Sequence, residues 1–445
     1  MNSKYTPVLV LILLCFVYSC KKIVTIKSQE TSIPRRGGPP NIIFVLADDM
    51  GYEMPTFDGG QSYDTRHLDS LAAKAMVFSQ CRATPICSPS RVELLSGVYN
   101  FRNYLKYGWA YYDPQFITYA KILQNNGYKT CISGKWQFAF NVTPRTMGFD
   151  NYCAIDGNGH LYRSPDFKID SVWSPARLHF NKYSEDISGD YALNFIHENR
   201  DKPFFLYYSF MLIHKPDQPT PLDPAYLSFD ESLSDTTYIG SMTHYLDVKV
   251  GVLMDKLKAE GLGGNTIIVF AGDNGSQGNF HSLYKGKEVA GEKGFTTELG
   301  MHVPLFVYWP GHIKPGTNDN LVDFSDFAPT FLDMAGVAAK PQGWDGVSFY
   351  PQLFGDNSNA RTWTYCYYDP FPQPSTSYPP YGSITSPISY AQDSSYKLYK
   401  TGWRHGLMYH FTQDLEEKHP LRDNDLTPAE VLIKQKLQAA LTNLQ

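Results

Sequence analysis

The chain has 445 residues, enough for a large α/β core with a smaller partner domain, and its net charge at pH 7 is only −5. It contains no long basic run, which excludes the electrostatic footprint of a nucleic-acid-binding protein. We therefore expect no nucleic-acid partner and look for the function in a localised site.

The first twenty residues resemble an export signal. Lys4 precedes an apolar run, Val8 to Val17, that is too short to span a bilayer, and Cys20 follows a small residue. The pattern is similar to the lipobox of bacterial lipoproteins, from which Tyr18 departs. We predict a lipoprotein signal peptide over residues 1–19 and lipidation of Cys20, with the lipid as the only membrane contact. An ordinary cleaved signal peptide is the alternative, and either signal exports the protein to the bacterial cell envelope or beyond.

Five cysteines remain after the signal. An odd number leaves at least one unpaired, and none of the five has the spacing of zinc ligands. The sequence therefore predicts neither a disulfide framework nor a zinc knuckle, and one cysteine is available for a chemical task. The five are Cys81, Cys87, Cys131, Cys153 and Cys366.

Residues 20–40 are polar, basic and rich in proline and glycine, a composition that predicts a flexible tether. Folded structure is predicted from Asn41, where a continuous apolar run to Ala47 is typical of a strand buried on both faces of a parallel sheet. Helix-like stretches separate this run from four more, which predicts an α/β fold with a mostly parallel sheet sandwiched by helices. The further runs are Tyr128–Ser133, Phe204–Phe210, Thr266–Ala271 and Val303–Tyr308.

Two helices are indicated by their patterns, one over Tyr238–Lys258 with apolar residues at helical spacing and one over Pro428–Leu444. The composition changes after Gly343, which suggests a larger domain over residues 41–343 and a smaller C-terminal α+β subdomain over residues 344–445. That subdomain contains a strand-like segment, Tyr396–Tyr399.

Polar residues collect where the predicted strands end. Ligands of open α/β sheets bind outside the carboxyl ends of the strands, so these side chains are expected to converge. The side-chain oxygens of two pairs, Asp48-Asp49 and Asp273-Asn274, suit Ca²⁺ or Mg²⁺. Each pair taken alone is more typical of a turn or a helix cap. The residues are Asp48, Asp49, Lys135, His214, Asp273 and Asn274.

The most informative segment is Cys87-Ser88-Pro89-Ser90-Arg91, followed by a helix-like stretch to Gly97. Pro89 suits the first turn of a helix. Cys87 is then expected at a helix N-terminus, where backbone N–H groups and the helix dipole favour an anion.

This pentapeptide resembles the Cys/Ser-x-Pro-Ser-Arg signature of the type I sulfatases, in the alkaline phosphatase superfamily. The similarity continues in order from Asn41 to about Leu421, and it implies an alkaline-phosphatase-like fold with the catalytic domain over residues 41–343. Further matching segments are Asp48-Asp49-Met50-Gly51-Tyr52, Leu68-Asp69-Ser70-Leu71-Ala72, Gly134-Lys135-Trp136, Gly148-Phe149-Asp150, Gly272-Asp273-Asn274-Gly275, Val303-Pro304-Leu305 and Trp309-Pro310-Gly311.

The resemblance implies that Cys87 is oxidised to formylglycine by a formylglycine-generating maturation machinery. In that family the hydrated aldehyde attacks sulfur in line and displaces the alcohol, and loss of the second hydroxyl's proton then expels sulfate. The implied reaction is hydrolysis of a sulfate ester. Exported bacterial sulfatases similar to this one commonly act on sulfated poly- or oligosaccharides, so the expected substrate is a sulfated carbohydrate.

The resemblance also implies a divalent cation, usually calcium in this family and less often magnesium, that acts as Lewis acid and template. Arg91 matches the arginine that supports the formylglycine and the metal, and Lys135 and Lys293 match lysines that contact the sulfate and the leaving oxygen. His214 matches the histidine that protonates or stabilises the departing alkoxide. The implied metal ligands are Asp48, Asp49, Asp273, Asn274 and residue 87.

Two positions depart from the family pattern. Gln137 stands where many members have a histidine, and glutamine forms hydrogen bonds but is no base near neutral pH. The base for sulfate elimination is therefore unassigned, with Asp48 or another histidine as candidates. His302 stands where arginine is frequent, and for it we favour a packing or supporting role over contact with the substrate.

Other interpretations compete with these. Aromatic residues make up 15% of the chain, and the Tyr/Trp-rich segment from Trp363 to Tyr381 either stacks on sugar rings or builds core and loop packing. A phosphomonoesterase or phosphodiesterase on the same scaffold is the first alternative function, and a non-catalytic glycan-binding lipoprotein is the second.

Overall fold

The computed structural model describes residues 38–103, 116–138, 142–155, 162–338, 340–369 and 387–444. The predicted signal peptide, Cys20 and nearly all of the predicted tether lie outside these residues, as does most of the aromatic segment that ends at Tyr381. Among the residues described, no helix combines the length and the apolar character needed to cross a bilayer.

A ten-stranded sheet organises the larger part of the described chain. Its five central strands, β9-β1-β8-β4-β5, run parallel, whereas antiparallel pairs flank them on both sides. The predicted mostly parallel α/β sheet is thereby confirmed. In spatial order the strands are β14 (Gly316–Asn318), β2 (Met76–Phe78), β13 (Leu305–Tyr308), β9 (Thr266–Gly272), β1 (Asn41–Ala47), β8 (Phe204–Ser209), β4 (Lys129–Lys135), β5 (Asn151–Ile155), β6 (Phe167–Ile169) and β7 (Val172–Ser174).

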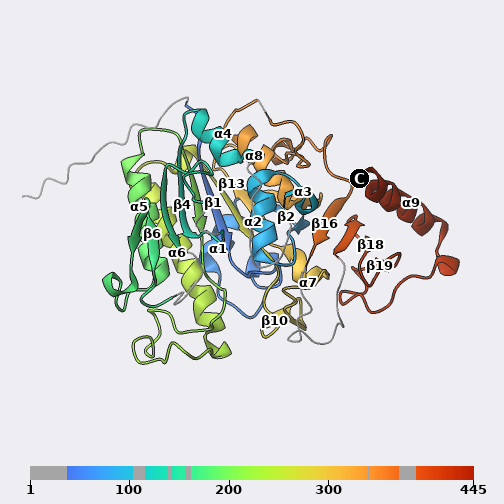
Figure 1. The fold of residues 1–445 in the computed structure, drawn as a ribbon, viewed down its shortest axis with the longest axis horizontal. Helices are drawn as coiled ribbons and strands as arrows, with labels where there is room; N and C mark the ends of the chain where they lie inside the picture. Colours follow the sequence, from blue (N-terminus) through green and yellow to red (C-terminus); the bar gives the residue numbers. More distant parts are fainter. Residues whose placement is uncertain are drawn as a thin grey trace, which may run out of the picture. The chain divides into compact units, whose positions relative to one another are not determined.

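Two hydrophobic layers cover the two faces of the sheet, because successive side chains of a strand point to opposite faces. In β1, Phe44 packs among side chains of α2, α4 and α8, whereas Val45 packs among those of α1, α5 and α6. Figure 1 shows α5 and α2 on opposite sides of the strands. The helices are α1 (Arg66–Ala72), α2 (Cys87–Ser96), α3 (Asn100–Asn103), α4 (Tyr119–Asn125), α5 (Ser184–Glu198), α6 (Ile239–Ala259), α7 (Glu298–Met301), α8 (Phe327–Met334) and α9 (Pro428–Asn443).

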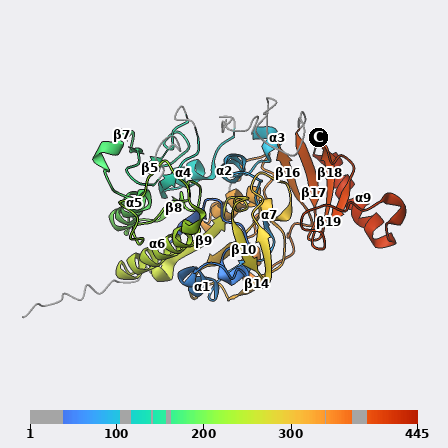
Figure 2. The same ribbon diagram turned by 90° about the horizontal axis from the view of Figure 1, so that it is seen from below.

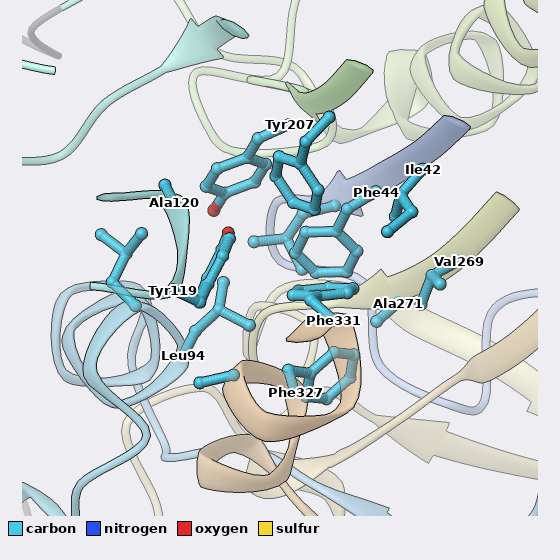
Figure 3. Close-up of a cluster of buried hydrophobic side chains, with 14 of the residues drawn as sticks. Ile42, Phe44, Leu94, Tyr119, Ala120, Tyr207, Val269, Ala271, Phe327 and Phe331 are labelled. Atoms are coloured by element: carbon cyan, nitrogen blue, oxygen red, sulfur yellow. The ribbon is translucent and has the colours of Figure 1, made fainter. Parts of the chain in front are cut away.

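Figure 3 shows the first of these layers, where aromatic rings meet between β1, β8 and α8. The ring of Phe44 lies 5.5 Å from that of Phe327 and 5.2 Å from that of Phe331, centroid to centroid. Both faces of β1 are fully buried, which explains why this strand is an unbroken apolar run in the sequence.

One predicted strand, Val303–Tyr308, is wrong as a single element. It divides at Pro304 into β12 (His302–Val303) and β13, and β13 runs antiparallel to β9. Proline has no N–H to donate, so one continuous ladder does not pass through it. β12 pairs instead with β3 (Cys81–Arg82), which also pairs with β15 (Val322–Asp323).

The C-terminal part has the predicted α+β character. A second sheet, antiparallel and four-stranded within the described residues, packs against α9, and Figure 2 shows α9 on the outer side of these strands. Leu437 and Leu441 of α9 pack among Leu398 and Met408 of the sheet. The strands are β16 (Thr364–Tyr368), β17 (Ile388–Gln392), β18 (Tyr396–Thr401) and β19 (Met408–His410). A separate hairpin joins β10 (His281–Tyr284) to β11 (Lys287–Ala290).

Candidate active site

The end of the sheet and the start of α2 bring three potential metal-ligating side chains together. Asp48 follows β1, Asp273 follows β9, and Cys87 is the first residue of α2. Because β1 and β9 are parallel neighbours, their carboxyl ends lie at the same edge of the sheet. One ligand atom from each of the three residues lies within 4.8 Å of the others, and all three residues are buried.

Two oxygens at this site are buried and have no hydrogen-bond partner among the described residues. They are Oδ1 of Asp48 and Oδ1 of Asn274. A buried polar oxygen without a partner carries a large desolvation cost, and hard carboxylate and amide oxygens are the ligands that Ca²⁺ and Mg²⁺ prefer. The residues present therefore fit a divalent cation.

Asp49 is predicted as a ligand from the family resemblance, and in this structure its carboxylate accepts hydrogen bonds from neighbouring side chains of the site. Lys293 Nζ lies 2.6 and 2.7 Å from its two oxygens, and both Asn274 Nδ2 and Gln277 Nε2 donate to it at 2.8 Å. Burial opposes ionisation of Asp49, but the ammonium groups of Lys293 and Lys135, together with the hydrogen bond from Lys293, outweigh it and lower the pKa. Asp49 is therefore the centre of a hydrogen-bonded cluster beside the three converging side chains.

Arg91 ties the helix of Cys87 to the sheet. It lies in α2, all ten residues of which are buried. Its Nε and Nη2 donate to Asp273 Oδ2 at 3.0 and 2.8 Å, and its Nη1 donates to Ser209 Oγ at 2.6 Å. A buried guanidinium needs such partners, so Arg91 and Asp273 form one structural unit.

Lys135 reaches the site from the last position of β4, where its ammonium group donates to Asp48. Gly134 precedes it with φ of 111°, and a Cβ there would lie 1.8 Å from the Ser209 carbonyl oxygen. Only glycine allows the strand to approach this closely, which explains the residue type directly before Lys135.

The side chain of His214 lies beside Asp49. It is 25% exposed, and its Nε2 is 4.0 Å from Asp49 Oδ2. Nδ1 lies 2.6 Å from the Lys215 carbonyl, which only accepts, so Nδ1 carries the proton in the neutral ring and Nε2 faces the site. Burial first, then Lys293 and Lys135, lower the pKa of His214 to about 3. The ring is therefore neutral at pH 7.

The thiol of Cys87 is not an activated nucleophile in its unmodified form. Burial raises its pKa, although Lys135 and Lys293 act in the opposite direction. The thiolate is the reactive species of a cysteine, so this thiol is unreactive at neutral pH. In the described part of the chain these five cysteines are all buried and unpaired.

The two residues that depart from the family pattern have different surroundings. Gln137 has a positive φ of 69°, and its buried Oε1 has no hydrogen-bond partner among the described residues. The ring of His302 stacks on that of Tyr52 at 4.0 Å between centroids, and its Nδ1 lies 3.4 Å from Glu298. His302 is thus packed in the protein interior.

Gln277 and Ser209 also contribute to the site, although neither was predicted from the sequence. Gln277 contacts Asp49, and Ser209 contacts Arg91. Gln277 lies three residues after Asn274, on the loop that the Gly-Asp-Asn-Gly segment begins, and this closeness was the available signal. Ser209 is the last residue of β8, so the rule that placed the other strand-end residues also applies to it.

Two protein-family models match the chain. The model described as "Sulfatase" covers residues 40–337, and that described as "N-sulphoglucosamine sulphohydrolase, C-terminal" covers residues 290–445. The chain belongs to the sulfatase family. This sulfatase is 30% identical to arylsulfatase G of Rattus norvegicus over 393 residues, which cover 75% of this chain and 72% of the relative. It is 27% identical over 432 residues to an N-acetylglucosamine-6-O-sulfatase of Bacteroides thetaiotaomicron, with 74% of each chain covered.

A solved structure supports the same assignment. It is that of BT4656 in complex with its substrate D-glucosamine-2-N,6-O-disulfate, which matches with a TM-score of 0.70 and 25% identity over 92% of this chain and 98% of that one. This sulfatase is therefore a sulfuric ester hydrolase with the alkaline-phosphatase-like α/β fold that the sequence resemblance implied.

Proposed function

We propose that this sulfatase removes sulfate from a sulfated carbohydrate, using formylglycine made from Cys87 and a bound divalent cation, Ca²⁺ rather than Mg²⁺. One observation carries the proposal: ligand atoms of Asp48, Cys87 and Asp273 lie within 4.8 Å of one another. Two buried oxygens that have no hydrogen-bond partner in the described residues, Asp48 Oδ1 and Asn274 Oδ1, belong to residues of the same strand ends.

The charges of the site favour binding of a divalent cation and, once it is bound, of an anionic substrate. Three cationic side chains lie among three carboxylates, so the protein alone is close to neutral here. A divalent cation makes the site net positive, which suits an anionic sulfate ester, and when bound it supplies Lewis-acid charge to the sulfate oxygens. Ca²⁺ accepts irregular sets of oxygen ligands more readily than Mg²⁺. The residues that would hold it are Asp48, Asp49, Asp273, Asn274 and residue 87.

The nucleophile is assigned to a modified residue because the unmodified thiol is unsuited to the task. A hydrated formylglycine supplies two hydroxyls at position 87, one to attack sulfur and one to release the sulfate afterwards. The proposal therefore includes a maturation machinery that oxidises Cys87.

Lys135 and Lys293 are assigned to the sulfate and the leaving oxygen, and His214 to protonation of the leaving oxygen. Burial is the main cause of the low pKa of His214, and Lys293 and Lys135 add to it. An anionic ester bound between the two lysines offsets part of their positive charge and so favours protonation of the ring, which acid catalysis requires. Asp48 or another histidine would act as base in sulfate release, since Gln137 is unable to do so.

The substrate class and the location are part of the proposal. The names of the relatives support a carbohydrate, because one is an N-acetylglucosamine-6-O-sulfatase and another was solved with a sulfated glucosamine. Export and lipid anchoring through Cys20 are proposed from the N-terminal sequence, and they would give the enzyme access to polysaccharides outside the cytoplasm.

Mass spectrometry of the tryptic peptide that contains residue 87 tests the nucleophile, and release of sulfate or phosphate from aryl esters and sulfated oligosaccharides tests the reaction. We expect formylglycine at residue 87 and release of sulfate from a sugar. Release of phosphate alone would favour a phosphatase. An unmodified thiol from a host competent for the modification, with release of neither anion, defeats the enzymatic proposal.

Removal of divalent cations is expected to abolish sulfate release and to lower the melting temperature. A cation that binds only the folded state stabilises it, and here it also satisfies the buried oxygens of Asp48 and Asn274. Elemental analysis confirms removal, and Ca²⁺ should restore both properties more completely than Mg²⁺. Full activity in protein shown to be free of metal contradicts the assignment.

A further inference from the structure

Lys293 lies on a loop, residues 291–297, between β11 and α7. Two backbone hydrogen bonds hold this loop against the site. The N–H of Lys293 donates to the Ser276 carbonyl at 2.9 Å, and the N–H of Gly294 donates to the Pro85 carbonyl at 2.8 Å. Ser276 lies two residues after Asn274, and Pro85 lies two residues before Cys87. The position of the loop therefore determines where the Lys293 ammonium lies relative to residue 87.

A third attachment comes from the C-terminal sheet. Lys397 of β18 is fully buried, and its ammonium donates to the backbone carbonyl of Thr296 and to Glu417 Oε1, the latter at 2.6 Å. The hydroxyl of Tyr399 lies 2.9 Å from Thr296 Oγ1 and donates to Glu417 Oε2 at 2.6 Å. Arg404 completes the cluster by donating to Glu417 and, at 2.9 Å, to the Tyr399 hydroxyl.

Stability alone is a poor explanation for this cluster. A buried ion pair loses hydration that its mutual attraction barely offsets, so apolar side chains of similar volume often serve as well. The ammonium of Lys397 does something that an apolar side chain is unable to do, since it joins Glu417 of its own subdomain to a carbonyl of the loop that carries Lys293.

We propose that Lys397 is a positioning residue that holds Lys293 at the active site through Thr296, so that this side chain of the C-terminal sheet takes part in catalysis without itself contacting the substrate. The inference rests on the proposed contact between Lys293 and the sulfate. A displacement of a positioned group by about 1 Å is enough to cost roughly 100-fold in rate.

The kinetic test compares Lys397→Met, Lys293→Met and the double variant with an aryl sulfate. Lys397→Met is expected to lower kcat/KM by about 10- to 100-fold in the natural background and by less than about 2-fold in the Lys293→Met background, because its effect passes through Lys293. Lys397→Arg should recover part of the loss. Tyr399→Phe removes one hydroxyl from the same cluster, and it provides a milder variant should Lys397→Met fold poorly.

Hydrogen exchange of residues 291–297, followed by mass spectrometry, gives a readout that is independent of activity. A matched control is Arg361→Met, which breaks another buried ion pair, that of Arg361 with Asp326. In the described part of the chain the hydrogen bonds of Arg361 go to residues outside the loop. Both variants are expected to lose stability, but only Lys397→Met should speed exchange in the loop and lower kcat/KM.

Two results would overturn the inference. One is unchanged hydrogen exchange of residues 291–297 in Lys397→Met. The other is a loss of kcat/KM from Lys397→Met that is as large in the Lys293→Met background as in the natural one. Wild-type protein that releases no sulfate would defeat the proposed function instead, and in that case the exchange measurement still decides whether Lys397 holds the loop.

Discussion

Replacement of Cys87 with alanine is expected to abolish sulfate release while the chain still folds. Alanine removes only the sulfur, at a helix N-terminus where Cys87 has no disulfide to lose. In the proposed mechanism the neighbouring side chains stabilise charge or transfer protons, and none of them replaces the nucleophile. We therefore expect kcat to fall by about 10⁴-fold or more. Sulfate release and thermal unfolding measure the two properties separately.

Two further variants sharpen this result. Cys87→Ser is expected to lose most activity, because the usual aerobic maturation does not convert serine to the aldehyde. Cys131→Ala removes a different buried cysteine, one packed in the hydrophobic layer that contains side chains of α1, α5 and α6, and should retain turnover. Turnover that persists in Cys87→Ala would refute the proposed nucleophile.

The second large effect is expected at Asp273, which is both a proposed metal ligand and the ion-pair partner of Arg91. Asp273→Ala leaves the buried guanidinium without its carboxylate, so the free energy of unfolding should fall by about 3–5 kcal/mol, and activity should be lost. Asp273→Asn keeps an oxygen acceptor for Arg91 and should recover stability but not activity. Urea unfolding and kcat of the folded protein distinguish the two effects.

Asp326→Ala serves as the comparison for Asp273→Ala, since it removes the carboxylate partner of Arg361 at a buried ion pair elsewhere. It should reduce stability without reducing the kcat of the molecules that remain folded. An Asp273→Ala enzyme that is as stable and as active as the natural one would show that this carboxylate has neither role.

The elements that could be predicted are those whose pattern reflects local geometry. β1 was recognisable because both its faces are buried, and α6 because its apolar residues recur at helical spacing along one face. The division at Pro304 was missed because an apolar run alone does not show where a ladder breaks, although proline is itself the signal.

The site was predictable to the extent that strand ends converge. Asp48, Lys135 and Asp273 each follow or end a parallel strand, and the sheet brings them to one edge. The position of Lys293 depends instead on contacts of its loop with Ser276, Pro85 and the C-terminal sheet, which are distant in sequence, so no local pattern reveals it. For Lys293 only the family resemblance supplied the assignment.

The complete burial of α2 determines whether oxidation of Cys87 precedes or follows folding. Cys87 is 6% exposed, and the nine residues that follow it in the helix are buried as well. If an enzyme oxidises Cys87, it has to bind residues 87–96 while the polypeptide is still unfolded, because this segment is buried in the native state. A molecule that folds first keeps its thiol, and rapid overproduction would then yield a mixture of active and inert copies with the same native structure.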